Sequence, residues 1–350
     1  MTTEVAKSDA HGDWPTLLCD NARTGGHGQH SGRAPEKAIW QLRTGGAIRS
    51  APILDDGTLY VTSINGVLHA IDADKGISKW KFQAGGQIHS TPSLSENKIL
   101  FGCDDGKLYA IDRHAGSKLW EAPTEDEVWT SPVVRSGFVF FGSADARVYA
   151  VDAASGRSRW SRELGGRIYS TAYAGEHQLY VGCGDGKMYC LDNSSGKILW
   201  STATGNGIDS SPAVLNDLVL VGSEDFSFYA MDADSGGIRW KYETAMGIAA
   251  SPAVLNDLTV IGSKDGFLYA LETSTGHLRW KTVVGEIVTA PAVIGDGMIC
   301  IQGEGTIALD VATGKILWRA GLASAMQSVP VLAGDTTYLA SLSGEVYALR

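Results

Sequence analysis

The side chains best suited to chemistry occupy the third position of a six-residue segment that recurs about every 40 residues. In the copies AIRSAP (47–52) and QIHSTP (87–92), the second residue is aliphatic and the fourth is serine. The third residue differs between copies: it is Ala249 and Val288 in two of them, and Arg49, His89, Trp129, Tyr169, Asp209 and Gln327 in the other six. Aromatic walls with a few charged and hydrogen-bonding groups are typical of ligand pockets. We therefore predict that these six residues bind a ligand.

The same set also suggests how a ligand would be held. An acidic or planar molecule could stack on Trp129 or Tyr169. Arg49 and His89 would supply positive charge. Imidazole, carboxylate and phenol groups can exchange protons, so the candidates for acid/base catalysis are His89, Asp209 and Tyr169. The alternative, equally open, is that this position is only wet and polar.

The element that must position these residues is a repeat. Tryptophan recurs at a spacing of 40 residues, with one final step of 38, at Trp40, Trp80, Trp120, Trp160, Trp200, Trp240, Trp280 and Trp318. Alternating runs such as TLYVTS (58–63) and VLHAID (67–72) predict short strands. Pairs such as Asp105-Gly106 favour tight hairpins between such strands. We interpret the in-register tryptophans as apolar plates between neighbouring units.

The residue pattern of each unit predicts a four-stranded antiparallel meander. Eight such units around one axis make an all-β, eight-bladed β-propeller. We expect residues 1–35 to be an N-terminal lead-in and residues 36–350 to be a single propeller. The last unit lacks its fourth strand. We predict that residues 36–43 supply it and close the ring by pairing with residues 345–349, which removes an exposed sheet edge. The recurring segments would be the innermost strands, so their third residues would ring one mouth of the central channel.

A family resemblance follows from the pattern S-x-P…D-G-x-L-Y-A-x-D-x-x-x-G-x-x-x-W, which runs from about residue 36 to residue 350. It resembles the PQQ-like repeat (pyrroloquinoline-quinone enzyme repeat). The lead-in DWPTLLCDNARTG (13–25) is similar to the segment before the first blade in such proteins. The resemblance implies two branches, which are quinoprotein dehydrogenases with PQQ and calcium, and cofactor-free BamB-like propellers.

The sequence lacks the dehydrogenase features that the resemblance implies. It has no adjacent cysteine pair, no long insertions between repeats and no acidic cluster of the kind that calcium needs. The resemblance in fold would admit PQQ and calcium, but we predict no cofactor. No zinc-ligand spacing, phosphate loop or serine-nucleophile motif is present, and we predict no metal.

These observations favour a binding or protein-scaffolding module with a small-molecule pocket at the channel mouth. The alternative is an enzyme that uses the channel residues for acid/base chemistry, and a PQQ-dependent dehydrogenase is the less favoured form of it. In EDFSF, Phe226 replaces a hairpin glycine, and we predict that it anchors a protein partner. The residues before the hairpin Asx-Gly pairs form a second variable set, which includes Asp104, Glu224 and Lys264.

The overall composition excludes some partners. The net charge of −10 without a basic stripe argues against nucleic-acid binding. No apolar run is long enough to span a bilayer, and the first residues lack the apolar core of a signal peptide. We expect a cytoplasmic monomer, or a periplasmic one if a leader was removed. The odd number of cysteines, five, favours free and mostly buried thiols.

Overall fold

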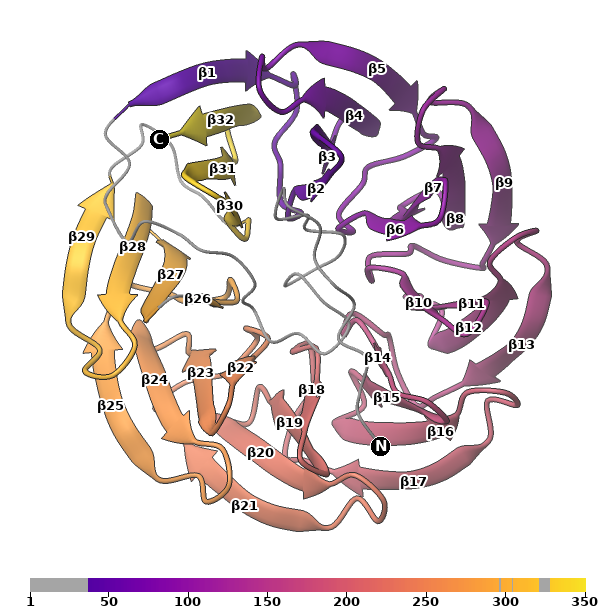
Figure 1. Cartoon of the computed structure of the whole chain (residues 1–350). Coiled ribbons are helices and arrows are strands. Elements are labelled where there is room, and N and C mark those ends of the chain that lie inside the picture. Colours follow the sequence, from indigo (N-terminus) through magenta and orange to yellow (C-terminus); the bar gives the residue numbers. More distant parts are fainter. Residues whose placement is uncertain (1–36, 296, 304, 321–327) are drawn as a thin grey trace.

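The eight predicted blades are present. The computed structural model describes residues 37–295, 297–303, 305–320 and 328–350, and these form 32 strands in eight four-stranded antiparallel sheets. The sheets stand around a central axis, with the shortest strands innermost (Figure 1). The predicted all-β propeller is therefore confirmed. None of the described segments forms a helix of the length and apolarity that a bilayer crossing requires.

Each blade runs outward from its inner strand to its rim strand. Blades 1 and 2 are β2 Ile53–Asp55, β3 Thr58–Thr62, β4 Val67–Asp72, β5 Ser78–Gln83, and β6 Ser93–Ser95, β7 Lys98–Cys103, β8 Lys107–Asp112, β9 Lys118–Pro123. Blades 3 and 4 are β10 Val133–Arg135, β11 Phe138–Gly142, β12 Arg147–Asp152, β13 Ser158–Glu163, and β14 Tyr173–Ala174, β15 Gln178–Gly182, β16 Lys187–Asp192, β17 Ile198–Ala203. Blades 5 and 6 are β18 Ala213–Leu215, β19 Leu218–Gly222, β20 Ser227–Asp232, β21 Ile238–Glu243, and β22 Ala253–Leu255, β23 Leu258–Gly262, β24 Phe267–Glu272, β25 Leu278–Val283. Blades 7 and 8 are β26 Val293–Gly295, β27 Met298–Gly303, β28 Gly305–Asp310, β29 Ile316–Ala320, and β30 Val331–Ala333, β31 Thr336–Ala340, β32 Glu345–Leu349, β1 Ala38–Arg43.

The recurring segments are not strands, which corrects one expectation. The inner strand of blade 1 begins at Ile53, directly after the segment 47–52. The other blades have the same offset, except blade 7, where the inner strand begins two residues after Pro291. The backbone of these segments is bonded to side chains of the next blade instead. The N–H of Ala51 donates to Thr91 Oγ1 at 3.0 Å, and the N–H of Thr91 donates to Ser131 Oγ at 3.1 Å. The hydroxyl one residue before the proline position therefore joins neighbouring blades, and this belt continues through Ser251.

The in-register tryptophans lie between blades, as predicted. The indole N–H of Trp160 donates to Asn193 O of the next blade at 2.8 Å, and five other tryptophans donate to the equivalent carbonyl. The ring also covers a glycine of that blade. A Cβ at Gly196 would lie 2.5 Å from Trp160 Cε3, and the φ of Gly196 is +66°. Only glycine fits both the backbone conformation and the space.

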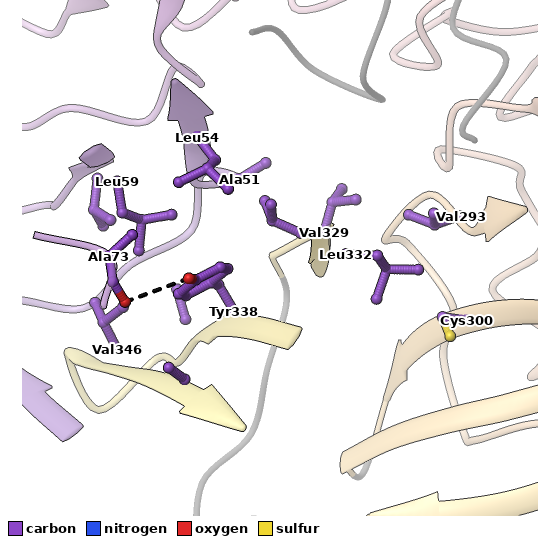
Figure 2. Close-up of a cluster of buried hydrophobic side chains, with 14 of the residues drawn as sticks. Ala51, Leu54, Leu59, Ala73, Val293, Cys300, Val329, Leu332, Tyr338 and Val346 are labelled. Atoms are coloured by element: carbon purple, nitrogen blue, oxygen red, sulfur yellow. Dashed lines mark hydrogen bonds between the residues drawn. The ribbon is translucent and has the colours of Figure 1, made fainter. Parts of the chain in front are cut away.

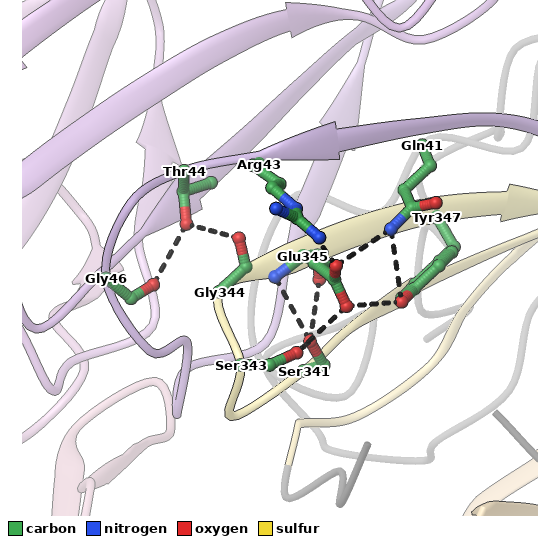
Figure 3. Close-up of polar contacts among 9 residues, drawn as sticks. All are labelled: Gln41, Arg43, Thr44, Gly46, Ser341, Ser343, Gly344, Glu345 and Tyr347. Atoms are coloured by element: carbon green, nitrogen blue, oxygen red, sulfur yellow. Dashed lines mark hydrogen bonds and ion pairs between the residues drawn. The ribbon is translucent and has the colours of Figure 1, made fainter. Parts of the chain in front are cut away.

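The ring closes through the N-terminal strand, as predicted. β1 pairs antiparallel with β32, with Gln41 opposite Tyr347 and Arg43 opposite Glu345. Figure 3 shows Glu345 accepting hydrogen bonds from Gln41 Nε2 at 2.9 Å and Arg43 Nε at 3.2 Å, and from the Tyr347 hydroxyl at 2.6 Å. In blades 2 to 6 the equivalent tyrosine donates to the hairpin aspartate. In blade 8, Ser343 occupies the aspartate position and Glu345 accepts the bond.

The apolar core is continuous across this closure. One buried cluster contains Val293 and Cys300 of blade 7, Leu332 and Tyr338 of blade 8, and Leu59 of blade 1 (Figure 2). The Tyr338 hydroxyl donates to Ala73 O of blade 1 at 3.3 Å. Packing on both sides of blade 8 therefore holds the last blade between its neighbours. Residues 1–35, which we predict to be a lead-in, lie outside the described residues.

Candidate binding face at the channel mouth

The recurring segments lead into the innermost strands at one end of the propeller. We call this end the mouth face. The hairpins between the second and third strands of each blade lie at the same face, because Asp104 N donates to Gln87 O at 2.9 Å and Glu224 N donates to Gly207 O at 3.0 Å. Within each segment, burial alternates. In blade 1, Ile48 and Ser50 are buried on either side of the exposed Arg49. The neighbours therefore serve packing, and the third side chain does not.

Three of the predicted ligand residues are in contact. The ring centroids of His89 and Trp129 are 4.6 Å apart, and those of Trp129 and Tyr169 are 5.0 Å apart. These residues come from blades 2, 3 and 4, so they form a strip that crosses three blades, which we call the aromatic strip. Trp129 is 36% exposed although its ring has an aromatic neighbour from each adjacent blade. Part of its indole is therefore accessible to a ligand.

His89 has a carboxylate partner that the sequence did not reveal. Its Nε2 is 3.5 Å from Asp104 Oδ2, at the blade 2 hairpin. Burial lowers the pKa of His89 and Arg49 lowers it further, while Asp104 opposes the shift. Burial raises the pKa of Asp104, against the effects of His89 and of a hydrogen bond from the Trp129 side chain. The only signal in the sequence was the place of Asp104 in the second variable set.

Asp209 belongs to a different group on the same face. Burial raises the pKa of Asp209, the nearby Glu224 raises it further, and Lys264 opposes them. Lys264 Nζ donates to Glu224 Oε1 at 2.6 Å. Within the described residues, no hydrogen bond or ion pair joins Asp209 to His89. The third catalytic candidate, Tyr169, accepts a hydrogen bond from Arg167 Nη1 at 3.2 Å.

Val288 and Gln327 are the remaining predicted positions of the variable ring. Val288 is 3% exposed, and its N–H donates to Ser263 O just as that of Ile248 donates to Ser223 O. Val288 is therefore a packing residue, and its assignment to the variable ring was wrong. The sequence alignment followed Pro291, which lies one residue earlier than in the other blades, so Thr289 holds the third position. Gln327 lies outside the described residues.

The described residues offer little for metal or thiol chemistry. Among them, no group of three or more His, Cys, Asp or Glu side chains could hold a metal ion. The four described cysteines, Cys103, Cys183, Cys190 and Cys300, are free and buried. Burial raises the pKa of each thiol to about 12. These thiols are therefore protonated at neutral pH and unreactive.

A cavity of about 350 Å³ lies elsewhere, between blades 5 and 6. It is lined by the β18–β19 turn, by Arg239 and by the turn after β24 at Thr273 and Ser274. These turns stand at the end of the strands opposite the mouth-face hairpins. Arg239 is already paired with Asp232. None of the predicted ligand residues lines this cavity.

Comparison with known proteins places the chain among propellers. A family model described as outer membrane protein assembly factor BamB matches residues 30–170 and 144–350. BamB from Moraxella catarrhalis has a TM-score of 0.77 at 18% identity, and the match covers 90% of this chain and 99% of that one. Quinohemoprotein alcohol dehydrogenase from Comamonas testosteroni has a TM-score of 0.83 at 15% identity, covering 97% of this chain and 80% of that one. The computationally designed Ika8 protein has a TM-score of 0.80 at 15% identity, covering 90% and 99%. Likeness at such identities shows the fold alone. No curated protein matches the sequence.

Proposed function

The chain belongs to the family of outer membrane protein assembly factor BamB, and from this membership we propose that it is a PQQ-like propeller that works as a binding and scaffolding module. The family match spans the propeller, since it covers residues 30–170 and 144–350. Assembly is the role in the family's description, and it favours a protein partner. We propose that the partner contacts this chain on the mouth face.

The observation that carries the proposal is the aromatic strip. The equivalent residue of blade 6 is Ala249, so the repeat does not require an aromatic side chain at this position. Trp, Tyr and Arg are enriched where proteins bind partners. The rings of His89, Trp129 and Tyr169 follow one another over three blades, which suits an extended protein segment. A small planar ligand at the channel mouth is the narrower form of the same proposal, supported by the residue types alone.

The PQQ and calcium implied by the fold resemblance do not fit these side chains. The Trp129 ring already has two aromatic neighbours, with ring centroids at 4.6 Å and 5.0 Å, and they crowd the space that a quinone would need for stacking. Calcium requires several oxygen ligands. The carboxylate of Glu224 is bound by Lys264, and that of Asp104 lies against His89. We therefore derive no redox step for this site.

A second candidate function, acid/base catalysis on a small molecule, has one observation in its favour. His89 Nε2 lies 3.5 Å from Asp104 Oδ2, and the lowered pKa of His89 keeps the imidazole neutral and able to accept a proton at neutral pH. A screen of activated ester substrates tests it. Hydrolysis should be lost in His89→Ala and kept in His277→Ala, whose imidazole is exposed.

Site-specific crosslinking tests the binding function. A photoreactive phenylalanine analogue would replace Glu127, beside the strip, or Glu163 on the outer strand β13 as the matched control. In extracts of the source organism, we expect a discrete adduct from position 127 that Trp129→Ala abolishes. The mass of the adduct distinguishes a protein from a small molecule. The same adduct from position 163, or one that persists without Trp129, would contradict the proposal.

A further inference from the structure

Four large apolar side chains are exposed on the mouth face of blades 5 to 7, away from the aromatic strip. Phe226 is 50% exposed, Met246 45%, Val283 55% and Ile287 63%. We call this set the apolar arc. Single exposed apolar residues are common, but contiguous ones mark interaction sites.

Hydrogen bonds between the loops show this continuity. Thr244 donates to Phe226 O from its N–H at 2.8 Å and from Oγ1 at 3.0 Å, and Oγ1 also lies 2.7 Å from Met246 O. The next residue, Ala245, donates its N–H to Asp265 Oδ2 at 3.0 Å. Val284 N donates to Gly266 O at 3.0 Å. The loops that carry the arc are thus hydrogen bonded to one another from the blade 5 hairpin to the blade 6 hairpin.

The repeat does not account for these side chains. The position of Phe226 is Gly66, Gly106, Ala146, Gly186 and Gly266 in the other blades. The position of Met246 is Gly46, Gly86, Asp126, Gly166, Asn206 and Glu286. The position of Val283 is Arg43, Gln83, Pro123, Glu163, Ala203 and Glu243, and that of Ile287 is Ala47, Gln87, Glu127, Arg167, Gly207 and Gly247. Large apolar residues at these positions are thus confined to neighbouring loops of three blades.

Phe226 carries an additional cost to folding. Its φ is +73°, in the left-handed region that bulky residues rarely adopt. Four of its five counterparts named above are glycines, for which this conformation is unstrained. A strained residue with an exposed aromatic ring stabilises neither the hairpin nor the core. Strain of this kind is found mainly at functional sites.

We propose that the apolar arc docks a protein partner that presents apolar side chains flanked by lysine or arginine. Carboxylates lie next to the arc in sequence or by hydrogen bond, at Glu224, Asp225, Glu243, Asp265 and Glu286. The nearby cations are Lys241, Lys264 and Lys281. The first two are each bound to a glutamate, and Lys281 Nζ lies 4.9 Å from the centroid of the Phe267 ring. The arc is therefore an apolar surface with an acidic border, and complementarity of charge selects a basic border on the partner.

This surface is separate from the aromatic strip. The strip comes from blades 2 to 4, whereas the arc comes from blades 5 to 7. The inference therefore goes beyond the proposed function of the strip, and a variant in one surface leaves the other intact. Trp129→Ala should abolish the crosslinked adduct of the aromatic strip and leave peptide binding at the apolar arc unchanged. A failure at one surface therefore does not count against the other.

The test uses a variant built from the repeat's own residues. Phe226→Gly, Met246→Asn, Val283→Gln and Ile287→Gln each install a side chain that another blade carries at that position, so the fold is kept and all carboxylates remain. The probes are two labelled amphipathic peptides with identical leucines, one with flanking lysines and the other with flanking glutamates. Ile77→Ser, which removes a 57% exposed side chain and installs the residue of blade 2, is the matched control.

Fluorescence anisotropy measures binding to the full chain. We expect the lysine peptide to bind at least tenfold more tightly than the glutamate peptide. The fourfold variant should lose at least tenfold in affinity, while Ile77→Ser and Trp129→Ala stay within twofold of the unmodified protein. Equal binding by the fourfold variant would show that charge alone attracts the peptide, and would overturn the proposal. Sedimentation giving a dimer that the fourfold variant abolishes would assign the arc to a second copy, and would overturn it as well.

Discussion

The imidazole of His69 makes the propeller sensitive to acid in a way that can be measured. In blades 2 to 6 and in blade 8, the equivalent residue is tyrosine. His69 is 1% exposed, and neither ring nitrogen has a hydrogen-bond partner within the described residues. Burial, with a smaller contribution from Lys81, lowers its pKa from 6.5 to about 4. The folded state therefore holds this histidine neutral where the unfolded chain would protonate it.

The sign and size of the effect follow from this difference. Above pH 6.5 the imidazole is neutral in both states and contributes no pH dependence. Between pH 6.5 and about 4, only the unfolded chain takes up the proton, so the free energy of unfolding falls by about 1.4 kcal/mol per pH unit. The total loss is about 3 kcal/mol, which is a large share of the about 5–15 kcal/mol typical of folded proteins.

Urea unfolding at several pH values tests the reasoning. His69→Phe keeps an aromatic ring but cannot titrate, and carboxylate titrations common to both proteins cancel in the difference between them. We expect the variant's advantage in unfolding free energy to grow by about 3 kcal/mol between pH 7 and pH 4. A second variant, His69→Tyr with Asn65→Asp, restores the tyrosine–aspartate pair of the other blades and should behave alike. A difference that stays constant with pH would refute the assigned pKa.

Three further predictions concern the scaffold. Trp160→Phe should cost about 1 kcal/mol more than Trp120→Phe in urea unfolding, because the Trp160 indole N–H is hydrogen bonded whereas that of Trp120 is buried without a partner in the described residues. Equal losses would contradict this. Gly196→Ala should cost about 2–5 kcal/mol, since the new Cβ meets the Trp160 ring and the φ is positive. Gly137→Ala, with φ +78° and no atom within 4 Å, should cost only about 1–2 kcal/mol. Glu345→Gln should lower the melting temperature because Glu345 joins the closing strand to blade 8, whereas Glu243→Gln, an exposed acid on β21, should not. An unchanged melting temperature for Glu345→Gln would place the strength of the closure elsewhere.

The fold could be predicted from the sequence because the signals that define each blade lie within that blade. The tryptophan spacing, the hairpin glycines and the missing last strand each depend on residues close in the chain, and β1 pairs with β32 as they require. We expected the segment 47–52 to be an innermost strand, because its residue types alternate as in a strand. The burial of its side chains does alternate, but the segment is not a strand. Its backbone N–H groups bind hydroxyls 40 residues away, as Ala51 binds Thr91. Nothing local marks such a partner.

The candidate site was less predictable for a related reason. The sequence separates variable positions from repeated ones, but it does not state which variable side chains meet. His89, Trp129 and Tyr169 come together because neighbouring blades carry them at the same height. Asp104 joins them only because the blade 2 hairpin folds back over the segment that holds His89. In blade 7, a one-residue shift of the proline was enough to misplace Val288.

The distribution of variation over the two faces bears on how a partner approaches. On the face opposite the mouth, the turns after the third strands repeat as Asp-x-x-x-Gly, and Asp152, Asp192 and Asp232 each hold their own turn by hydrogen bonds to its backbone. Those side chains are occupied by local structure and are not free to specialise. The mouth-face loops carry both the aromatic strip and the apolar arc, with Asp209, Glu224 and Lys264 between them. The mouth face therefore offers a partner the aromatic strip and the apolar arc, which another propeller with the same repeat need not carry.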